Sequence, residues 1–401
     1  MILRTLIIFI LFFIINPLFS IILLAVYGTN VESHLSSKGK SQCLVLFGIM
    51  CCIFVSLINM QIITAYTVDL DVYVYKYQIA SKYDFFPYLL VGPDGVVDAY
   101  KEPLYHSVVW ILNRLFNGAE KPFKFTISLL EYSLLISAVI LFGKRMKMKM
   151  PIIMTGVVWM CFYPLFFTST MNIVRQTLAN SMLLFIMVRC FFYDKRDWIG
   201  IIAMLLVHAS SAFFLPLLLM PQLGKPFKQS WYLLCGIVVV LLSYQILSQS
   251  LFDIGTFSAD SSAGVALSRA SEGAKGEFTY STLSFCVVLG MLVLSICLYA
   301  GKLVSPTVGL RRLASVIIVL SVFVLMNSGE GQIAGRFAHY VDSFIPFLLM
   351  LFLGFKIRNN TIAIVLSFTI IILFTIYLHI GLWKFDVVAG GWFTPVFLYL
   401  F

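Results

Sequence analysis

Apolar runs of about 20 residues follow one another along nearly the whole chain, with short polar stretches between them. A helix needs about 20 apolar residues to cross the hydrocarbon core of a bilayer, so each run predicts a membrane span. The predicted fold class is all-α: a polytopic membrane protein of about ten transmembrane helices, built as a single membrane domain over residues 1–401. The predicted spans are 5–26, 43–64, 125–143, 151–168, 177–193, 231–251, 282–300, 313–327, 339–355 and 361–382.

Two further segments, 103–117 and 199–220, have a different pattern. In the first, apolar residues recur at helical spacing with polar residues between them, which predicts a helix lying in the outer interface of the membrane. The second contains His208 in the middle of an apolar run. Small neighbours of this histidine favour a broken or re-entrant segment.

The distribution of charge predicts the sidedness of the membrane. Bases cluster between spans, most strongly from Lys144 to Lys149, and such clusters mark the cytoplasmic side of an inner membrane. Most of the acids lie in the predicted outer loops 64–124 and 253–280. The predicted spans agree with this distribution of charge if both termini lie outside and 199–220 returns to the side from which it enters. We therefore expect the outer face to be the working face.

Composition excludes several other classes of protein. Apolar residues make up 61% of the chain, charged residues only 11%, and the mean hydropathy is +0.98, which rules out a soluble enzyme or a disordered chain. The net charge of +10 does not indicate nucleic acid, because the bases lie in small groups beside apolar runs. The first apolar run is too long for a signal peptide. The eight cysteines lack metal-ligand spacing and are interpreted as packing residues, and we predict no metal and no cofactor.

Polar residues inside or at the outer ends of spans are costly, which makes them candidates for function. Asp69 and Asp71 are followed by Tyr73 and Tyr77 at the start of the first outer loop. Carboxylates accept hydroxyl protons and aromatic faces stack on sugar rings, so this group suits a carbohydrate substrate. The alternative is a solvated acidic start of the loop.

Further candidates are Glu102, in the first outer loop, and Arg175, Gln176 and His208, which lie between the two outer loops. Glu102 precedes Pro103 and either caps the following helix or points into a cavity. Arg175, with Gln176 beside it, lies at the outer end of a span, where a guanidinium either grips a phosphate in a bidentate fork or extends to the interface. His208 either takes part in proton transfer or bonds to a backbone carbonyl.

The last candidates lie at the outer start of the predicted span 339–355. Arg336 and Tyr340 are four residues apart and are expected to share a helix face, with Glu330 in the same outer loop as a partner for Arg336. Taken together, the candidates offer two arginines for a phosphate, carboxylates and a histidine for proton transfer, and tyrosines for sugars. All are predicted on the outer side.

The order of these motifs resembles that of a known family. The series D-x-x-x-Y-x-x-x-Y, E-P, R-Q-x-x-A, H-x-S and R-F-x-x-Y over roughly residues 40–350 is similar to the EpsG-like family of bacterial polysaccharide polymerases, related to the Wzy O-antigen polymerases. One departure is Tyr66-Thr67-Val68, where the family usually has small residues before the first aspartate. Either Asp69 or Asp71 therefore occupies the family position.

The resemblance implies a metal-independent glycosyltransferase on the periplasmic face of the bacterial inner membrane, with an arrangement of helices compatible with the GT-C type. It would join polyprenyl-pyrophosphate-linked oligosaccharide repeat units into O-antigen, capsular polysaccharide or exopolysaccharide, with membrane lipid and a chain-length regulator protein as partners. The implied catalytic residues are Arg175, His208, Arg336, Asp69 and Asp71, and the implied substrate-binding residues are Tyr73, Tyr77, Glu102, Gln176 and Tyr340. Which of Asp69, Asp71, Glu102 and His208 is the base stays open.

Two other functions remain as alternatives. One is a GT-C-type transferase that adds a single sugar from a polyprenyl phosphate. The other is a flippase for lipid-linked oligosaccharides, which would need charged residues along a path to both faces. Only Glu131 lies in the middle of a predicted span, which argues against the flippase.

Overall fold

The computed structural model describes residues 2–64, 68–90, 102–226, 235–236, 281–328, 331–380 and 395–400. Within these ranges the chain forms helices and connecting loops and no strand, which confirms the predicted all-α class. The chain divides into two compact units, the first made of Met1–Phe214 with Leu349–Phe401 and the second of Leu215–Leu348.

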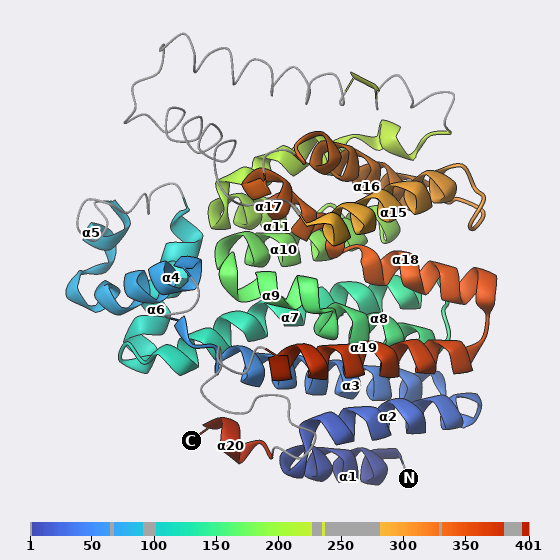
Figure 1. Ribbon diagram of the computed structural model, residues 1–401, viewed down its shortest axis with the longest axis horizontal. Coiled ribbons are helices and arrows are strands. Elements are labelled where there is room, and N and C mark those ends of the chain that lie inside the picture. Colours follow the sequence, from blue (N-terminus) through green and yellow to red (C-terminus); the bar gives the residue numbers. More distant parts are fainter. Residues whose placement is uncertain are drawn as a thin grey trace. The chain divides into compact units, whose positions relative to one another are not determined.

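The first unit contains most of the helices (Figure 1). They are α1 (Ile2–Ile15), α2 (Pro17–Val31), α3 (Ser37–Asn59), α4 (Val68–Ile79), α5 (Phe85–Leu90), α6 (Pro103–Phe116), α7 (Glu120–Arg145), α8 (Met150–Phe162), α9 (Pro164–Asn172), α10 (Val174–Phe192), α11 (Trp198–Val207), α19 (Asn360–Ile380) and α20 (Phe397–Leu400). The second unit contains α12 (Leu215–Leu219), α15 (Thr282–Tyr299), α16 (Val308–Met326) and α17 (Gly331–Asp342), and α18 (Ile345–Phe352) leads back to the first unit.

Among the described residues, six helices are long and apolar enough to cross a membrane, and α8 with α9 makes a seventh if this pair, bent by 50°, is one span. The chain is therefore a multi-pass membrane protein. The predicted count of ten is not confirmed. Of the predicted span 231–251, only Cys235 and Gly236 lie within the described residues, and the predicted outer loop 253–280 lies wholly outside them.

The predicted first span, 5–26, is two helices rather than one crossing. The side chain of Asn16 accepts a hydrogen bond from the Phe19 amide at 3.0 Å, and Pro17 begins α2, so the two residues end one helix and start another. Ser20 Oγ donates to the Phe9 carbonyl at 2.7 Å, whereas residues eleven apart in a straight helix would be separated by about 16 Å. The prediction of a single crossing is wrong, because α1 and α2 fold back on each other (Figure 1).

The core of the first unit is built around α7, which packs against α3, α8 and α10. Small residues allow this close approach: a Cβ atom at Gly143 would lie 2.6 Å from Ile153 of α8. Asn59 Nδ2 of α3 donates to Ser128 Oγ of α7 at 2.9 Å, which joins the two helices in the interior. These contacts hold the four helices together in one bundle.

The predicted outer loop 64–124 contains three helices, α4, α5 and α6. The sequence predicts α6 as a helix at 103–117, and the structure has it at Pro103–Phe116. It does not predict α4, which is fixed on α6 because Asn113 Nδ2 donates to the Tyr77 carbonyl at 2.6 Å. The Tyr77 hydroxyl donates to the Ala119 carbonyl at 3.1 Å, which ties α4 to the start of α7 as well.

The segment 199–220 is broken, as predicted. Helix α11 ends at Val207, and His208 has an extended backbone, with φ −153° and ψ 117°. A 3-10 turn over Ala209–Phe214 follows. Because the helix stops there, the His208 side chain lies at a helix end rather than in the middle of an apolar helix.

Candidate functional site

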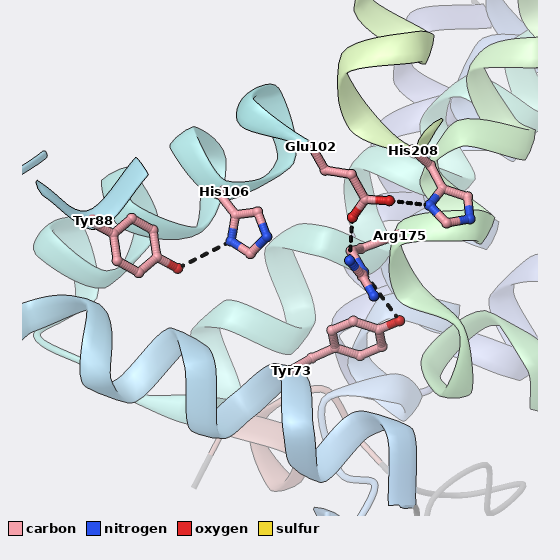
Figure 2. A network of polar contacts seen from close by, with 6 residues as sticks. All are labelled: Tyr73, Tyr88, Glu102, His106, Arg175 and His208. Atoms are coloured by element: carbon pink, nitrogen blue, oxygen red, sulfur yellow. Dashed lines mark hydrogen bonds and ion pairs between the residues drawn. The ribbon is translucent and has the colours of Figure 1, made fainter. Parts of the chain in front are cut away.

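Glu102 is the centre of a polar network in the first unit (Figure 2). It occupies the N-cap position of α6, but its side chain makes no capping hydrogen bond. One carboxylate oxygen pairs with Arg175 Nη1 and the other with His208 Nδ1. The side chain is only 7% exposed, so the two predicted alternatives resolve in favour of a carboxylate that points inward.

Arg175 comes from the first turn of α10 and reaches two partners. Besides its pair with Glu102, its Nε lies 3.5 Å from the Tyr73 hydroxyl. The guanidinium also lies over the Tyr73 ring, 5.3 Å from the centroid, which is a cation–π contact. Nη2 makes no hydrogen bond within the described part of the chain, and the side chain as a whole is 28% exposed.

His208 is positioned by the end of α11. Because Nδ1 lies against a carboxylate oxygen, the neutral ring carries its proton on Nδ1 and leaves the lone pair on Nε2. The side chain is 21% exposed, and Nε2 makes no hydrogen bond with the described residues. The carboxylate thereby fixes both the tautomer and the orientation of the ring.

The electrostatics of the network favour the charged form of Glu102. Burial by itself raises the pKa of this carboxyl, but the hydrogen bond from His208 and the charge of Arg175 outweigh burial and lower the pKa to about 2. Glu102 is therefore ionised at neutral pH. It balances the charge of Arg175 and accepts the hydrogen bond from His208.

A second group of side chains lies beside this network, contributed by α5 and α6. The ring of Tyr105 meets that of Tyr73 edge to face at 6.1 Å, and the Tyr88 hydroxyl lies 3.4 Å from His106 Nδ1 (Figure 2). Burial, aided by the charge of Arg175, lowers the pKa of His106 to about 4, so this histidine is neutral. The Tyr105 hydroxyl is buried and has no hydrogen-bond partner among the described residues.

Tyr105, His106 and Tyr88 are not among the site residues predicted from the sequence. A signal for the first two is present in their spacing, because they follow Glu102 by three and four positions at the start of a helix. Tyr88 has no such signal, since its contact with His106 depends on the fold of α5 against α6.

The other candidates of the first unit lie around the network rather than in it. On α4, Asp69 is half-buried on the face that carries Tyr73, whereas Asp71 is exposed beside Tyr75. Tyr77 is fully buried, stacks on Phe123 at 4.2 Å and bonds to backbone carbonyls. Gln176 is buried on α10, next to Arg175. Among the predicted residues, the structure therefore brings together Tyr73, Glu102, Arg175 and His208.

The two remaining candidates, Arg336 and Tyr340, belong to the second unit. On α17, Arg336 is exposed and Tyr340 is buried, 1% exposed, with its ring 5.9 Å from that of Phe337. The proposed partner Glu330 lies outside the described residues.

The network and the basic run lie at opposite ends of the bundle. Arg175 is at the start of α10, and the guanidinium of Arg145, at the end of α7, lies over the Tyr193 ring just after the end of α10, 5.5 Å from its centroid. These ends of α10 are about 26 Å apart at 1.5 Å per residue. Within the described residues, no group of three or more His, Cys, Asp or Glu side chains is arranged to hold a metal ion.

Comparisons with known proteins give one match. No curated protein and no solved structure matches the chain. The model of the EpsG family matches residues 44–393, which covers the described network and most of the predicted spans. The chain therefore belongs to the EpsG family and is a membrane protein of the polysaccharide polymerase type.

Proposed function

We propose that this protein is a polymerase that joins polyprenyl-pyrophosphate-linked oligosaccharide repeat units at the outer face of the inner membrane. The observation that carries the proposal is the bridging position of Glu102, which holds a cation for the phosphate and a base for the acceptor with its two oxygens. Family membership supports the reaction class. The proposal adds the identity of the substrate and the membrane face at which the reaction takes place.

In the proposed reaction, a sugar hydroxyl of the incoming unit attacks the anomeric carbon of the growing chain. A new glycosidic C–O bond forms while the bond from that carbon to the pyrophosphate oxygen breaks, and the pyrophosphate leaves with the electron pair. His208 Nε2 takes the hydroxyl proton. Of the four candidate bases, His208 is favoured because Glu102 fixes its tautomer, which is the role a carboxylate has beside a catalytic histidine.

Arg175 is placed to neutralise the pyrophosphate as its charge grows in the transition state. In the resting structure two of its nitrogens already contact Glu102 and Tyr73, so a phosphate oxygen first meets Nη2. A bidentate grip then requires one of these contacts to open. The proposal keeps Arg336 as a second arginine for the pyrophosphate. Together the two arginines would neutralise the charge that a metal ion neutralises in other transferases.

Tyrosines suit the sugar part of the substrate. The ring of Tyr73 is held from one side by Arg175 and from another by Tyr105, so the position of its hydroxyl is fixed. The Tyr105 hydroxyl beside it is buried and has no hydrogen-bond partner among the described residues.

The distribution of basic residues supports placing the network at the outer face of the membrane. The bases Lys144, Arg145, Lys147 and Lys149 lie at the end of the bundle opposite to the network, and such a run marks the cytoplasmic end of membrane helices. The network then lies at the end where a flipped, lipid-linked substrate is delivered.

Deletion of the gene in the source organism, followed by profiling of polysaccharide length and lipid-linked intermediates, tests the function. The proposal expects single repeat units to accumulate on the lipid carrier and long chains to disappear. Persistence of long chains would overturn it. Loss of one sugar from an otherwise complete polymer would favour the single-sugar transferase.

The role of Arg175 is tested by Arg175→Lys in the complemented strain. Lysine keeps the positive charge but lacks the planar fork, and we expect polymer yield to fall at least tenfold. Near-normal polymerisation would rule out a guanidinium-specific grip on the phosphate.

A further inference from the structure

A groove in the first unit lies between α3 and α7, two of the helices long and apolar enough to span a membrane, and none of the network residues lines it. Its volume is about 560 Å³, within the range of small-molecule sites. Small residues form part of its lining: Gly48 and Cys52 on α3, and Ser133 and Ser137 on α7. The side chain of Phe185 from α10 adds to one wall.

The groove is long and polar at one end. Its lining on α7 extends from Leu129 to Lys144, about 22 Å along the helix axis. Most of this length is apolar, and Lys144 supplies the only charged group of the lining, at the cytoplasmic end. The shape and polarity therefore match one amphiphile, with an apolar chain and a headgroup at Lys144.

The headgroup end is suited to an anion. Lys144 Nζ donates to Ser41 Oγ at 2.8 Å, which leaves two ammonium protons and the Ser41 hydroxyl proton for a phosphate. The adjacent first turns of α3 contribute Lys38 and Lys40, and neither 36–48 nor 137–149 contains an acid. A phosphodiester headgroup that carries no cationic group of its own therefore fits these surroundings best.

The apolar part of the groove by itself selects no lipid, because lipid tails are as apolar as the helix surface. Selection must come from the headgroup, where each base near the membrane surface is worth about 1 kcal/mol for an anionic lipid. We propose that the groove between α3 and α7 is a binding site for an anionic phospholipid of the cytoplasmic leaflet, with its phosphate at Lys144 and Ser41 and one chain along Ser137 and Ser133. This site is separate from the proposed polymerase chemistry.

Native mass spectrometry of the full-length protein in detergent tests the site, with phosphatidylglycerol and phosphatidylcholine of equal chain length as probes. We expect the wild-type protein to retain phosphatidylglycerol more tightly. Lys144→Gln should weaken its retention about fivefold and leave phosphatidylcholine unchanged. The matched control is Arg145→Gln, which removes the same charge one residue later, where the guanidinium stacks on Tyr193 outside the groove.

Equal losses in Lys144→Gln and Arg145→Gln would overturn the proposal, because they would mean a general attraction to the basic end. Equal retention of the two lipids by the wild type would overturn it as well. Ser137→Trp fills the groove without changing charge and should abolish the preference. Ser133→Phe makes the same test at an exposed position that tolerates a larger side chain. A dimer that is lost in these two variants, with lipid retention unchanged, would assign the groove to a second copy and overturn the lipid site.

Discussion

Glu102 and Glu131 are both buried in the first unit, but their surroundings differ in the partners that they offer a carboxylate. Each oxygen of Glu102 has a cationic or imidazole partner. Both oxygens of Glu131, in the interior of α7, are buried with no hydrogen-bond partner among the described residues. Scarcity of charge in a membrane sequence draws attention to both. What distinguishes Glu102 from Glu131 is that its carboxylate oxygens have partners among the described residues.

The largest expected effect is that of Glu102→Gln. The amide cannot serve as acceptor for both Arg175 and His208, so we expect polymer synthesis to fall at least a hundredfold and the free energy of unfolding to drop by about 3 kcal/mol. The complemented deletion strain reports synthesis, and denaturation in detergent reports stability.

Glu131→Gln is the matched control, because it makes the same chemical change at a buried glutamate without partners. We expect polymer synthesis to stay within twofold of wild type. Similar losses in the two variants would remove the distinction between the two glutamates and, with it, the assignment of the site.

The next largest effect is expected for His208→Asn, which keeps a donor for Glu102 and removes the base. Synthesis should fall about a hundredfold, while the free energy of unfolding changes by less than about 1 kcal/mol. Rates at increasing pH sharpen the test, because hydroxide lowers the need for a base and should narrow the gap to wild type. A wild-type rate of this variant at neutral pH would show that another residue acts as the base.

The stability of the protein should depend on pH in two windows. The pKa of His106 is lowered to about 4, so as pH falls from 6.5 towards 4 the unfolded state gains a proton that the folded state does not, and up to about 3 kcal/mol of stability is lost. The pKa of Glu102 is lowered to about 2, so its contribution is complete above pH 4.5 and is lost between pH 4.5 and 2.

Denaturation midpoints in detergent between pH 8 and 2 check these windows. Replacement of the buried imidazole in His106→Asn should flatten the upper window and leave the lower one. A profile that is flat in the wild type down to pH 5 would contradict the neutral, buried state of His106.

The smallest expected effect is that of Tyr73→Phe. The ring and its cation–π contact with Arg175 remain, and only the hydroxyl 3.5 Å from Nε is lost, a change of about 1 kcal/mol. We expect the apparent KM for the lipid-linked substrate to rise a few-fold with kcat nearly unchanged. A large fall in kcat instead would place this hydroxyl in the chemistry.

The sequence predicts which residues form the centre of the site better than it predicts how they meet. Glu102, Arg175 and His208 stand out because ionisable groups are rare in apolar segments. Their convergence depends on the break of α11 at His208 and on the docking of α4 and α6, which are tertiary features. The helical form of 68–79 is hidden because its β-branched and tyrosine residues have little helical periodicity, and contacts with α6 stabilise it.

The division of the first apolar segment is missed for a different reason. An uninterrupted run of apolar residues predicts a membrane span by its length. Because proline is tolerated in membrane helices, Asn16 and Pro17 do not by themselves indicate that the predicted span is divided. The reversal is held by contacts such as that of Ser20 with Phe9, which no local pattern encodes.

That reversal changes the parity of the membrane crossings. Helices α1 and α2 have 14 and 15 residues, each short of the 17 that a crossing requires, and as a hairpin they carry the chain back to the side from which it came. The start of α1 and the end of α2 then share one side, and Glu32, just after α2, accepts the Met150 amide at 2.7 Å beside the basic run. If the basic run is cytoplasmic, as we propose, Arg4 lies on the same side as that run, and the rule that places positive charge inside accounts for the N-terminal region with one crossing fewer.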